Sequence, residues 1–374
     1  PPADFVREWD LKAWNKERPK KSAGGAPVSV LEDQWLQELR GMGADVDGVR
    51  RLAAVPVTGT LPGEVDRVAL AHRAVDVVAA GSRGRSAWNE FDLRGVAEEL
   101  LADQHLYGQD QIVSELAEDV TDRALQACLT TVPDRAVVPA DVRHWTSNQV
   151  VQMERDIKGR MAARAVDDAA PAPEQQVRMV MAREDRTLDT AQAEAVRQIG
   201  GTGKLVVVEG PAGAGKTTMM VTARDVIRDG NGRMIVVAPT RKAANVAAEE
   251  LDTDTDTAAA LAYAHGYRWD HHGVWQRLQP GDRDPVSGEA WRGVRSDAKL
   301  RPTDVLVVDE ADLLNQETAQ AMLHIADDAG CRVVMVGDRR QLTAVGRGGV
   351  LSMAARYAPA HVTLDEVHRF RTPD

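Results

Sequence analysis

The chain has 374 residues, of which 43% are hydrophobic and 28% are charged, so it is long enough to fold into two or three domains. Its two cysteines, Cys128 and Cys331, lie in apolar segments, which excludes a disulfide framework and a cysteine-rich zinc site and makes the cytoplasm the expected location. The formal net charge of −11 argues against a polybasic nucleic-acid-binding protein, and no apolar run approaches the ~20 residues of a membrane span.

The first 165 residues are predicted to be mostly helical, because apolar residues recur there at the spacing of one helix face. The predicted helices cover 31–42, 64–80, 95–104, 109–129 and 147–165. Asp92 is the expected N-cap of the third helix, and Thr146 or Ser147 is that of the fifth. No catalytic motif falls in this region, so a helical spacer is the expected role.

Two polar stretches are predicted to be linkers, because they are rich in proline, glycine and charged residues. The first covers 16–27. The second lies around 167–174 and reads Asp-Asp-Ala-Ala-Pro-Ala-Pro-Glu. We therefore expect a linker over 166–187 that separates the helical region, 1–165, from a second domain, 188–374.

From residue 188 the pattern changes to short apolar runs that alternate with amphipathic helices. The predicted strands are 204–208, 234–237, 305–308, 332–336 and 361–364, and the predicted helices are 215–228, 241–251, 314–329 and 349–357. Continuous runs of valine, isoleucine and leucine are typical of parallel strands that are buried on both faces. The fold class is therefore α/β with a parallel sheet. Between 267 and 301 the alternation breaks, and residues 267–278 indicate a small β-hairpin insertion.

A glycine-rich motif follows the first predicted strand of this domain. Residues 210–217 fit G-x-x-x-x-G-K-[ST] and stand between a strand and a helix, as this phosphate-binding loop (P-loop) requires. Glycines let backbone N–H groups turn inward around a phosphate, and the start of the helix adds a partial positive charge. Lys216 would reach the β- and γ-phosphates, and the Thr217 hydroxyl would ligate Mg²⁺; a plain glycine-rich turn is the alternative. The candidate nucleotide-binding residues of the loop are Gly210, Pro211, Ala212, Gly213, Ala214, Gly215, Lys216, Thr217 and Thr218.

Two acidic residues follow the predicted strand 305–308. Ligands bind at the carboxyl edge of open α/β sheets, so Asp309 and Glu310 are expected beside the phosphates. Asp309 would hold Mg²⁺ directly or through water, and Glu310 would orient and deprotonate the attacking water. The alternative is that the pair caps the next helix, a task that Asp312 could also perform.

Further polar residues follow other strands of the sheet. Gln341 comes shortly after strand 332–336 and would sense the γ-phosphate. Thr240 and Arg241 stand at a helix start, where a hydroxyl, a cation and free N–H groups suit a nucleic-acid phosphate. Gln192 precedes the first strand and would read the adenine edge. Arg369 follows the last strand and would reach back to the γ-phosphate.

These motifs occur in the order of the Q, I, Ia, II, III and IV motifs of superfamily 1 helicases of the RecD-like branch, which they resemble: Gln192, 210–217, 239–244, 309–310, 337–342 and Arg369. Residues 261–270 and 366–370 resemble the helicase part of MobF-type conjugative relaxases, the TraA-like transfer proteins. Residues 143–147 followed by Glu154 resemble the segment before that helicase. The resemblance covers about 140–374.

The resemblance implies a RecA-like P-loop domain that hydrolyses ATP with Mg²⁺ and moves along single-stranded DNA, with 5′ to 3′ as the expected direction. By matching positions it assigns ATPase roles to Lys216, Thr217, Asp309, Glu310, Gln341 and Arg369, and strand contacts to Thr240, Arg241, Thr257 and Trp269. The insertion at 267–301 would be the small 1B subdomain, where Trp269 and Trp275 would stack bases. A mini-core of the hairpin is the alternative for both tryptophans. Conjugation-machinery proteins are further implied partners.

Helicases of this kind bind ATP between two RecA-like domains, and one is predicted within 1–374. We therefore expect a fragment of a longer protein that binds Mg·ATP but hydrolyses it slowly. The nickase of a relaxase is also expected to be absent, because it needs a tyrosine nucleophile and a metal-binding histidine cluster. No H-x-H sequence occurs, and Tyr107 has only His105 nearby. Neighbouring side chains of a strand point to opposite faces, so His271 and His272 are expected not to chelate one metal together.

Three other functions fit parts of the pattern. A RecD-like repair helicase would share every motif, and a relaxase domain upstream of Pro1 would distinguish the two. A nucleotide-binding scaffold without turnover is disfavoured because the ATPase motifs are intact within 1–374. A small-molecule kinase is disfavoured by residues 239–244 and 337–342. For the helical region, a degenerate helicase-like or strand-gripping domain is the alternative to a spacer.

Overall fold

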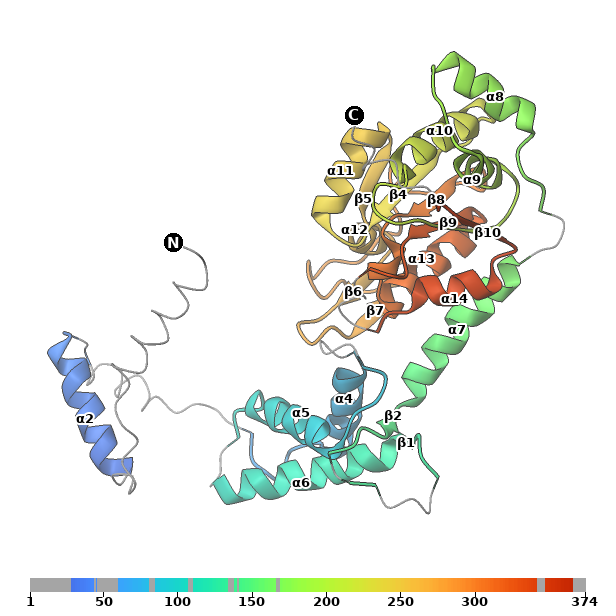
Figure 1. Ribbon diagram of the computed structural model, residues 1–374. Helices are drawn as coiled ribbons and strands as arrows, with labels where there is room; N and C mark the ends of the chain where they lie inside the picture. The colour runs from blue at the N-terminus through green and yellow to red at the C-terminus, as the bar shows by residue number, and fades with distance from the viewer. Residues whose placement is uncertain are drawn as a thin grey trace, which may run out of the picture. The chain divides into compact units, whose positions relative to one another are not determined.

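The computed structural model describes residues 28–43, 45, 60–80, 85–106, 110–133, 138–139, 141–165, 169–341 and 347–365 (Figure 1). The chain divides into two compact units, 1–59 and 60–374. In the first unit, helix α2 (Val28–Gly41) confirms the helix expected at 31–42, and it carries the exposed side chains of Trp35 and Leu39. Among the described residues, no helix is both long enough and hydrophobic enough to cross a membrane.

Three helices at the start of the second unit form a small bundle. They are α4 (Arg67–Ala80), α5 (Glu90–Ala102) and α6 (Asp110–Ala127), and they confirm three predicted helices. Their shared core contains Ala74, Trp88, Leu93 and Val120. Helix α5 begins earlier than expected because its N-cap is Asn89, which accepts a hydrogen bond from the Asp92 N–H at 3.0 Å. Asp92 is therefore the third residue of a capping box, and its prediction as the N-cap was wrong.

The next helix joins the bundle to the sheet, and its residue Val150 lies in the core of the bundle. Helix α7 (Asn148–Arg164) begins at the predicted N-cap Ser147, which follows a short antiparallel pair of β1 (Leu129–Thr130) and β2 (Trp145–Thr146). Its residues Ile157 and Met161 are fully buried in the core of the sheet. The structure therefore extends the sheet domain back to residue 148, and we use that name for the described residues 148–365.

The expected linker over 166–187 contains a helix. Helix α8 (Glu174–Arg183) places Val177 and Val180 in the hydrophobic core on one face of the sheet. Only these two of its residues are buried, Met181 packs partly against the same core, and the remaining positions include glutamine, glutamate and arginine. That polar composition explains why the segment resembles a linker in the sequence.

The sheet has six parallel strands in the order β10-β3-β9-β8-β4-β5. Five strands confirm the predicted ones: β3 (Leu205–Glu209), β4 (Met234–Ala238), β8 (Val305–Val308), β9 (Arg332–Gly337) and β10 (Ala360–Thr363). The sixth, β5 (Asp254–Thr257), was missed because its residues are polar. It lies at the edge of the sheet, where a strand needs no apolar side chains on both faces.

Helices cover both faces of the sheet (Figure 1). One face packs on α7, α12 (Ala258–Ala264), α13 (Gln316–Ala329) and α14 (Val350–Tyr357), and the other on α8, α9 (Thr190–Gly200), α10 (Lys216–Asp229) and α11 (Arg241–Leu251). Successive residues of β3 point to opposite faces, so Leu205 and Val207 enter the first core and Val206 and Val208 the second. Burial on both faces explains why the inner strands consist mainly of continuous apolar runs.

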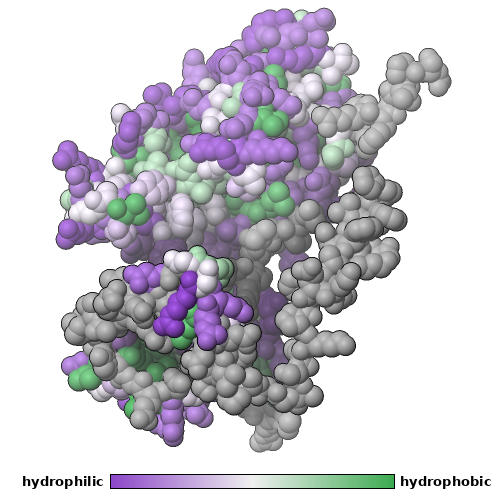
Figure 2. All heavy atoms as spheres, turned by 90° about the vertical axis from the view of Figure 1, so that its left-hand side faces the viewer, coloured by the Kyte–Doolittle hydropathy of each residue, from purple (hydrophilic) through white to green (hydrophobic). Residues whose placement is uncertain are grey.

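The insertion at 267–301 contains the predicted hairpin. Strands β6 (Tyr267–Trp269) and β7 (Trp275–Arg277) pair antiparallel, and Gly273 takes the left-handed backbone conformation that their turn requires. The rings of Trp269 and Trp275 stack with centroids 4.7 Å apart. In Figure 2 the described surface is mainly hydrophilic, with hydrophobic residues in separate patches. Trp269 is 39% exposed.

Candidate nucleotide-binding site

The phosphate-loop motif connects the end of β3 to the start of α10, as expected. Gly213 and Gly215 both have positive φ angles, of 83° and 73°, which residues with a Cβ adopt only at a cost. Gly215 is the N-cap of α10, so the first N–H groups of that helix open toward the loop. The sequence therefore forms a backbone cradle of the kind that surrounds a phosphate.

Lys216 and Thr217 begin α10 and make contacts with different partners. The Lys216 ammonium donates a hydrogen bond to the carbonyl oxygen of Gly210, at 2.8 Å, and so spans the loop. The Thr217 hydroxyl donates to a carboxylate oxygen of Glu250 on α11, at 2.9 Å. Glu250 was not predicted as a site residue, and it enters because α10 and α11 pack side by side on one face of the sheet.

The acidic pair follows β8, at the carboxyl edge of the sheet. Burial raises the pKa of Asp309, and the nearby Lys216 opposes this effect only in part. Burial also raises the pKa of Glu310, and the charges of Asp309 and Asp312 raise it further. Glu310 has a positive φ of 50°, an uncommon conformation for a non-glycine residue. Several carboxylates thus face one ammonium group, an arrangement that a divalent cation would stabilise.

One cavity of about 520 Å³ brings together most of the predicted ATPase residues. Its lining includes the loop residues, the acidic pair and Gln341, whose amide donates to Asp338 at 3.1 Å. The hydroxyl of Thr217 and the carboxylates of Asp309 and Glu310 are hard oxygen donors suited to Mg²⁺. The donor set and the cradle therefore fit a magnesium–nucleotide complex. Arg369, the predicted γ-phosphate contact, lies outside the described residues.

Gln192 contacts the phosphate loop through its side-chain amide. Its amide nitrogen donates to the carbonyl oxygen of Ala214, at 3.0 Å, and its amide oxygen accepts from the Asp189 N–H, at 3.1 Å. The side chain is only 4% exposed, and it completes a capping box at the start of α9. Gln192 thus has a structural contact to the phosphate loop that its sequence position did not reveal; contact with the adenine stays a prediction.

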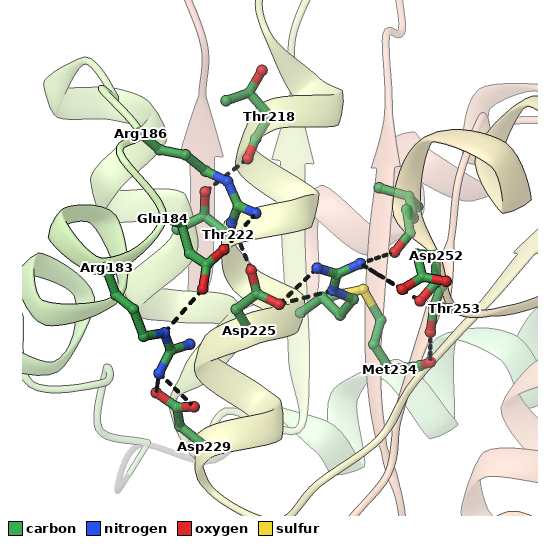
Figure 3. A network of polar contacts seen from close by, with 12 residues as sticks. Arg183, Glu184, Arg186, Thr218, Thr222, Asp225, Asp229, Met234, Asp252 and Thr253 are labelled. Atoms are coloured by element: carbon green, nitrogen blue, oxygen red, sulfur yellow. Dashed lines mark hydrogen bonds and ion pairs between the residues drawn. The ribbon is translucent and has the colours of Figure 1, made fainter.

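A buried network of charges attaches α10 to its neighbours (Figure 3). Asp225 is 4% exposed and accepts hydrogen bonds from Arg186, at 2.6 Å, and from Arg224, at 2.7 Å. Burial alone would raise the pKa of Asp225, but these hydrogen bonds outweigh it and lower the pKa. Arg186 stands between α8 and α9, so the network ties the helix of the phosphate loop to the segment that leads to Gln192.

Three of the residues predicted to contact DNA, Thr240, Arg241 and Thr257, lie at the same carboxyl edge of the sheet. Thr240 and Thr257 are the N-caps of α11 and α12. Their strands, β4 and β5, are neighbours, and Ala238 is the register partner of Thr257. Arg241 forms an ion pair with Asp256, at 2.8 Å, and the same Asp256 oxygen accepts from the Thr257 N–H, at 2.7 Å. The structure therefore brings three of these residues together, while Trp269 lies on the hairpin.

Acidic residues between the strand ends were missed by sequence reasoning. Asp312 accepts from the Asp338 N–H, at 3.0 Å, and so connects the end of β9 to the 3₁₀ turn Ala311–Leu313 after β8. Glu209, the residue before the loop, pairs with Arg339 and His361 and is buried. Its place directly before Gly210, at a strand end, is the one signal in the sequence that indicates such a role.

The chain matches known proteins in sequence. The family model described as an AAA domain matches residues 187–374. A probable conjugal transfer protein TraA of Sinorhizobium fredii is 23% identical over 227 residues, which are 61% of this chain and 18% of that protein. The ATP-dependent RecD2 DNA helicase of Deinococcus radiodurans is 29% identical over 184 residues, 49% of this chain and 22% of that protein.

The chain thus spans about a fifth of the length of these two relatives. A solved structure of two Pif1 helicases at forked double-stranded DNA matches with 20% identity and a TM-score of 0.33, over 50% of this chain and 46% of that one. The family model covers half of the sequence and all of the site motifs described above. The chain therefore belongs to the AAA domain family of P-loop proteins, as a TraA-like relative of the RecD-like superfamily 1 helicases.

Proposed function

We propose that this chain is the ATP-binding module of a DNA translocase, which moves 5′ to 3′ along single-stranded DNA as part of a conjugative relaxase. The observation that carries the proposal is the shared cavity, in which Lys216, Thr217, Asp309, Glu310 and Gln341 converge from three segments of the chain. Mg²⁺, held by Thr217 and Asp309, would supply neutralisation of the phosphate charges. Glu310 would hold the attacking water and accept its proton. Burial raises the pKa of Glu310, which makes its carboxylate a stronger base.

A groove for the DNA backbone is expected beside this cavity. The hydroxyl oxygens of Thr240 and Thr257 accept hydrogen bonds from Ala243 and Ala260, which leaves each hydroxyl proton available for a phosphate oxygen. The helix starts at both threonines add partial positive charge, and exposed Arg241 can exchange its partner Asp256 for a phosphate. This local set would attract phosphates although the whole chain carries a net charge of −11.

The two proposed ligands would be adjacent. A second cavity, of about 270 Å³, shares Thr217, Asp309 and Glu310 with the nucleotide cavity and continues to Thr240. A change in the contacts of the γ-phosphate would therefore reach the start of α11 through a few side chains. Such a short path is what coupling between nucleotide turnover and movement on DNA requires.

We expect slow hydrolysis by residues 1–374 alone. Within the described residues there is one six-stranded sheet with one phosphate loop, whereas the resemblance implies that a second RecA-like domain supplies an arginine to the phosphates. Single-stranded DNA is expected to increase the rate, because DNA bound at Thr240 would lie beside the cavity that shares Thr217, Asp309 and Glu310 with the nucleotide cavity.

The deciding experiment is the ATPase rate of the chain with and without single-stranded DNA. Lys216→Ala should abolish both rates, whereas Lys204→Ala, which changes an exposed lysine outside the cavity, should leave them unchanged. Arg241→Ala should weaken DNA binding in fluorescence anisotropy, with Arg178→Ala, also exposed, as its control. An ATPase rate that changes neither on addition of DNA nor in Lys216→Ala would contradict the proposal.

The similarity to RecD2 supports one alternative, a helicase that acts in DNA repair. The two functions share the ATP site and differ in the DNA on which the protein acts. A conjugation assay with the natural full-length gene distinguishes them. Loss of plasmid transfer on Lys216→Ala supports the relaxase assignment, and normal transfer with increased sensitivity to DNA damage supports repair.

A further inference from the structure

Two adjacent histidines lie together in the turn of the hairpin. The prediction that His271 and His272 face away from each other assumed a strand, and it was wrong because both residues lie in the turn between β6 and β7. Their ring centroids are 3.8 Å apart, and the rings are tilted by 41°. Both imidazoles therefore present nitrogen atoms to the same small region.

Carboxylates of α5 complete this region. Asp103, the C-cap of α5, has a carboxylate oxygen that lies with one nitrogen of each histidine in a group whose members are all within 4.8 Å of one another. Glu99, one helical turn earlier, has a carboxylate oxygen 3.8 Å from Nδ1 of His272. Two imidazoles and the Asp103 carboxylate thus converge from segments about 170 positions apart in the sequence, and Glu99 adjoins this group at His272.

The turn is held by contacts that do not use the imidazoles. One oxygen of Asp270 accepts hydrogen bonds from the N–H groups of His272 and Val274, both at 3.0 Å. Its other oxygen pairs with Arg73 of α4. Gly273, with φ of 81°, allows the chain to reverse. The turn is therefore stabilised by contacts that leave the imidazole nitrogens out.

Space is available beside the rings. A cavity of about 400 Å³ is lined by His271 and His272 together with Glu99, Trp88 and Phe91. Ligands about 2.0–2.2 Å from a tetrahedral ion lie roughly 3.3–3.6 Å apart, so shifts of about 1 Å would close the set around one ion. Nitrogen and oxygen donors in this combination favour Zn²⁺ and related transition-metal ions over Mg²⁺.

We propose that Asp103, His271 and His272, with Glu99 as a fourth donor, bind one transition-metal dication of the Zn²⁺ class. The ion would join the end of α5 to the hairpin turn, next to the Arg73–Asp270 pair. It would fix the hairpin, which carries the stacked Trp269 and Trp275, relative to the helical bundle. This site shares no residue with the nucleotide cavity and does not depend on the proposed function.

The test uses the full chain, freed of any histidine tag and of nucleotide. Titration with CoCl₂ should produce one equivalent of a visible d–d absorption, which ZnCl₂ then displaces. The double variant His271→Ala/His272→Ala should weaken cobalt binding at least about tenfold, and Asp103→Asn should weaken it as well. His72→Ala changes an exposed histidine of α4 outside the cluster and is the matched control.

A second measurement separates metal binding from misfolding. ZnCl₂ should raise the melting temperature of the wild-type chain, EDTA should reverse the increase, and the double variant should melt normally without a zinc response. Affinity that is unchanged in the double variant would overturn the proposal. So would an equal loss in His72→Ala, or the absence of a stoichiometric cobalt complex with the wild-type chain.

Discussion

The side-chain amide of Gln192 donates a hydrogen bond to the carbonyl oxygen of Ala214, 22 positions later in the chain. Ala214 lies between the two glycines with positive φ, so this bond fixes the most unusual part of the phosphate loop. The conformation of the loop is therefore stabilised by a side chain as well as by its own backbone geometry. A glutamine expected to read the adenine also determines the shape of the phosphate site.

Gln192→Ala should consequently weaken nucleotide binding. It removes one buried and one partly buried hydrogen bond and leaves the Ala214 carbonyl and the Asp189 N–H without these partners, at a cost of about 1–3 kcal/mol in unfolding free energy. Binding of a fluorescent ATP analogue measures the effect, which we expect to exceed about fivefold. Gln198→Ala is the control, because the Gln198 side chain donates a hydrogen bond to Glu194 on the same helix. Equal affinities of the two variants would contradict a role for Gln192 in shaping the loop.

Asp309→Asn should stabilise the nucleotide-free chain at neutral pH while it abolishes ATP turnover. Burial raises the pKa of Asp309, so the folded protein binds this proton more tightly than the unfolded chain does. The free energy of unfolding therefore falls as the pH rises from the ordinary value near ~4 through the raised pKa. The asparagine avoids this penalty, and its advantage should disappear under acidic conditions where the aspartate is protonated.

Thermal melts of both proteins between pH 4 and pH 8 check this prediction. The difference in melting temperature should grow with pH. A constant difference would show that packing of the amide, and not the charge of the carboxylate, is responsible.

Asp225→Ala should destabilise the sheet domain by about 2–4 kcal/mol, because it leaves Arg186 and Arg224 without their shared buried acceptor. The lowered pKa of Asp225 means that the wild-type contribution is present above the ordinary aspartate pKa and is lost as the pH falls through the lowered value. Denaturant unfolding at pH 7 measures the loss. Asp229→Ala is the matched control on the same helix: its pair with Arg183 is exposed, and its removal should cost less than about 1 kcal/mol.

Glu250→Gln should raise the Mg²⁺ concentration needed for nucleotide binding by about two- to fivefold. The Glu250 carboxylate contacts the Thr217 hydroxyl and lines the nucleotide cavity, so it adds negative potential at the position expected for the ion. Nucleotide binding titrated against MgCl₂ gives the half-saturating concentration. Glu249→Gln removes the same charge from the neighbouring position of α11, outside the cavity, and should have a smaller effect. Identical shifts in both variants would indicate only a general change of charge.

The sequence was sufficient to predict the inner strands of the sheet, because wholly apolar runs such as 205–208 and 305–308 are typical of parallel strands that are buried on both faces. It was also sufficient to place Lys216, Thr217, Asp309 and Glu310 in one cavity, since the carboxyl ends of parallel strands meet at one edge. Polar elements were harder to predict. Helix α8 buries only Val177 and Val180, and β5 buries no complete face.

The contacts that were missed join residues whose distance depends on packing. Glu250 meets Thr217 because two helices lie side by side, and no spacing in the sequence indicates that contact. The pairing of His271 with His272 depended on whether the residues lie in a strand or in a turn, a boundary that differs by one or two positions. The sequence pattern therefore predicted the site residues at the strand ends. It did not predict the side chains that neighbouring helices and turns contribute.

The polar edge strand β5 also bears on self-association. A strand at the margin of a sheet has backbone groups that a second copy can pair with, and apolar margins invite that pairing. Here the margin carries Asp254 and Asp256, whose side chains are exposed, and Arg241 lies against it. Copies of the chain that approach along this margin would bring like charges together, so the same composition that hid β5 from prediction discourages aggregation through it.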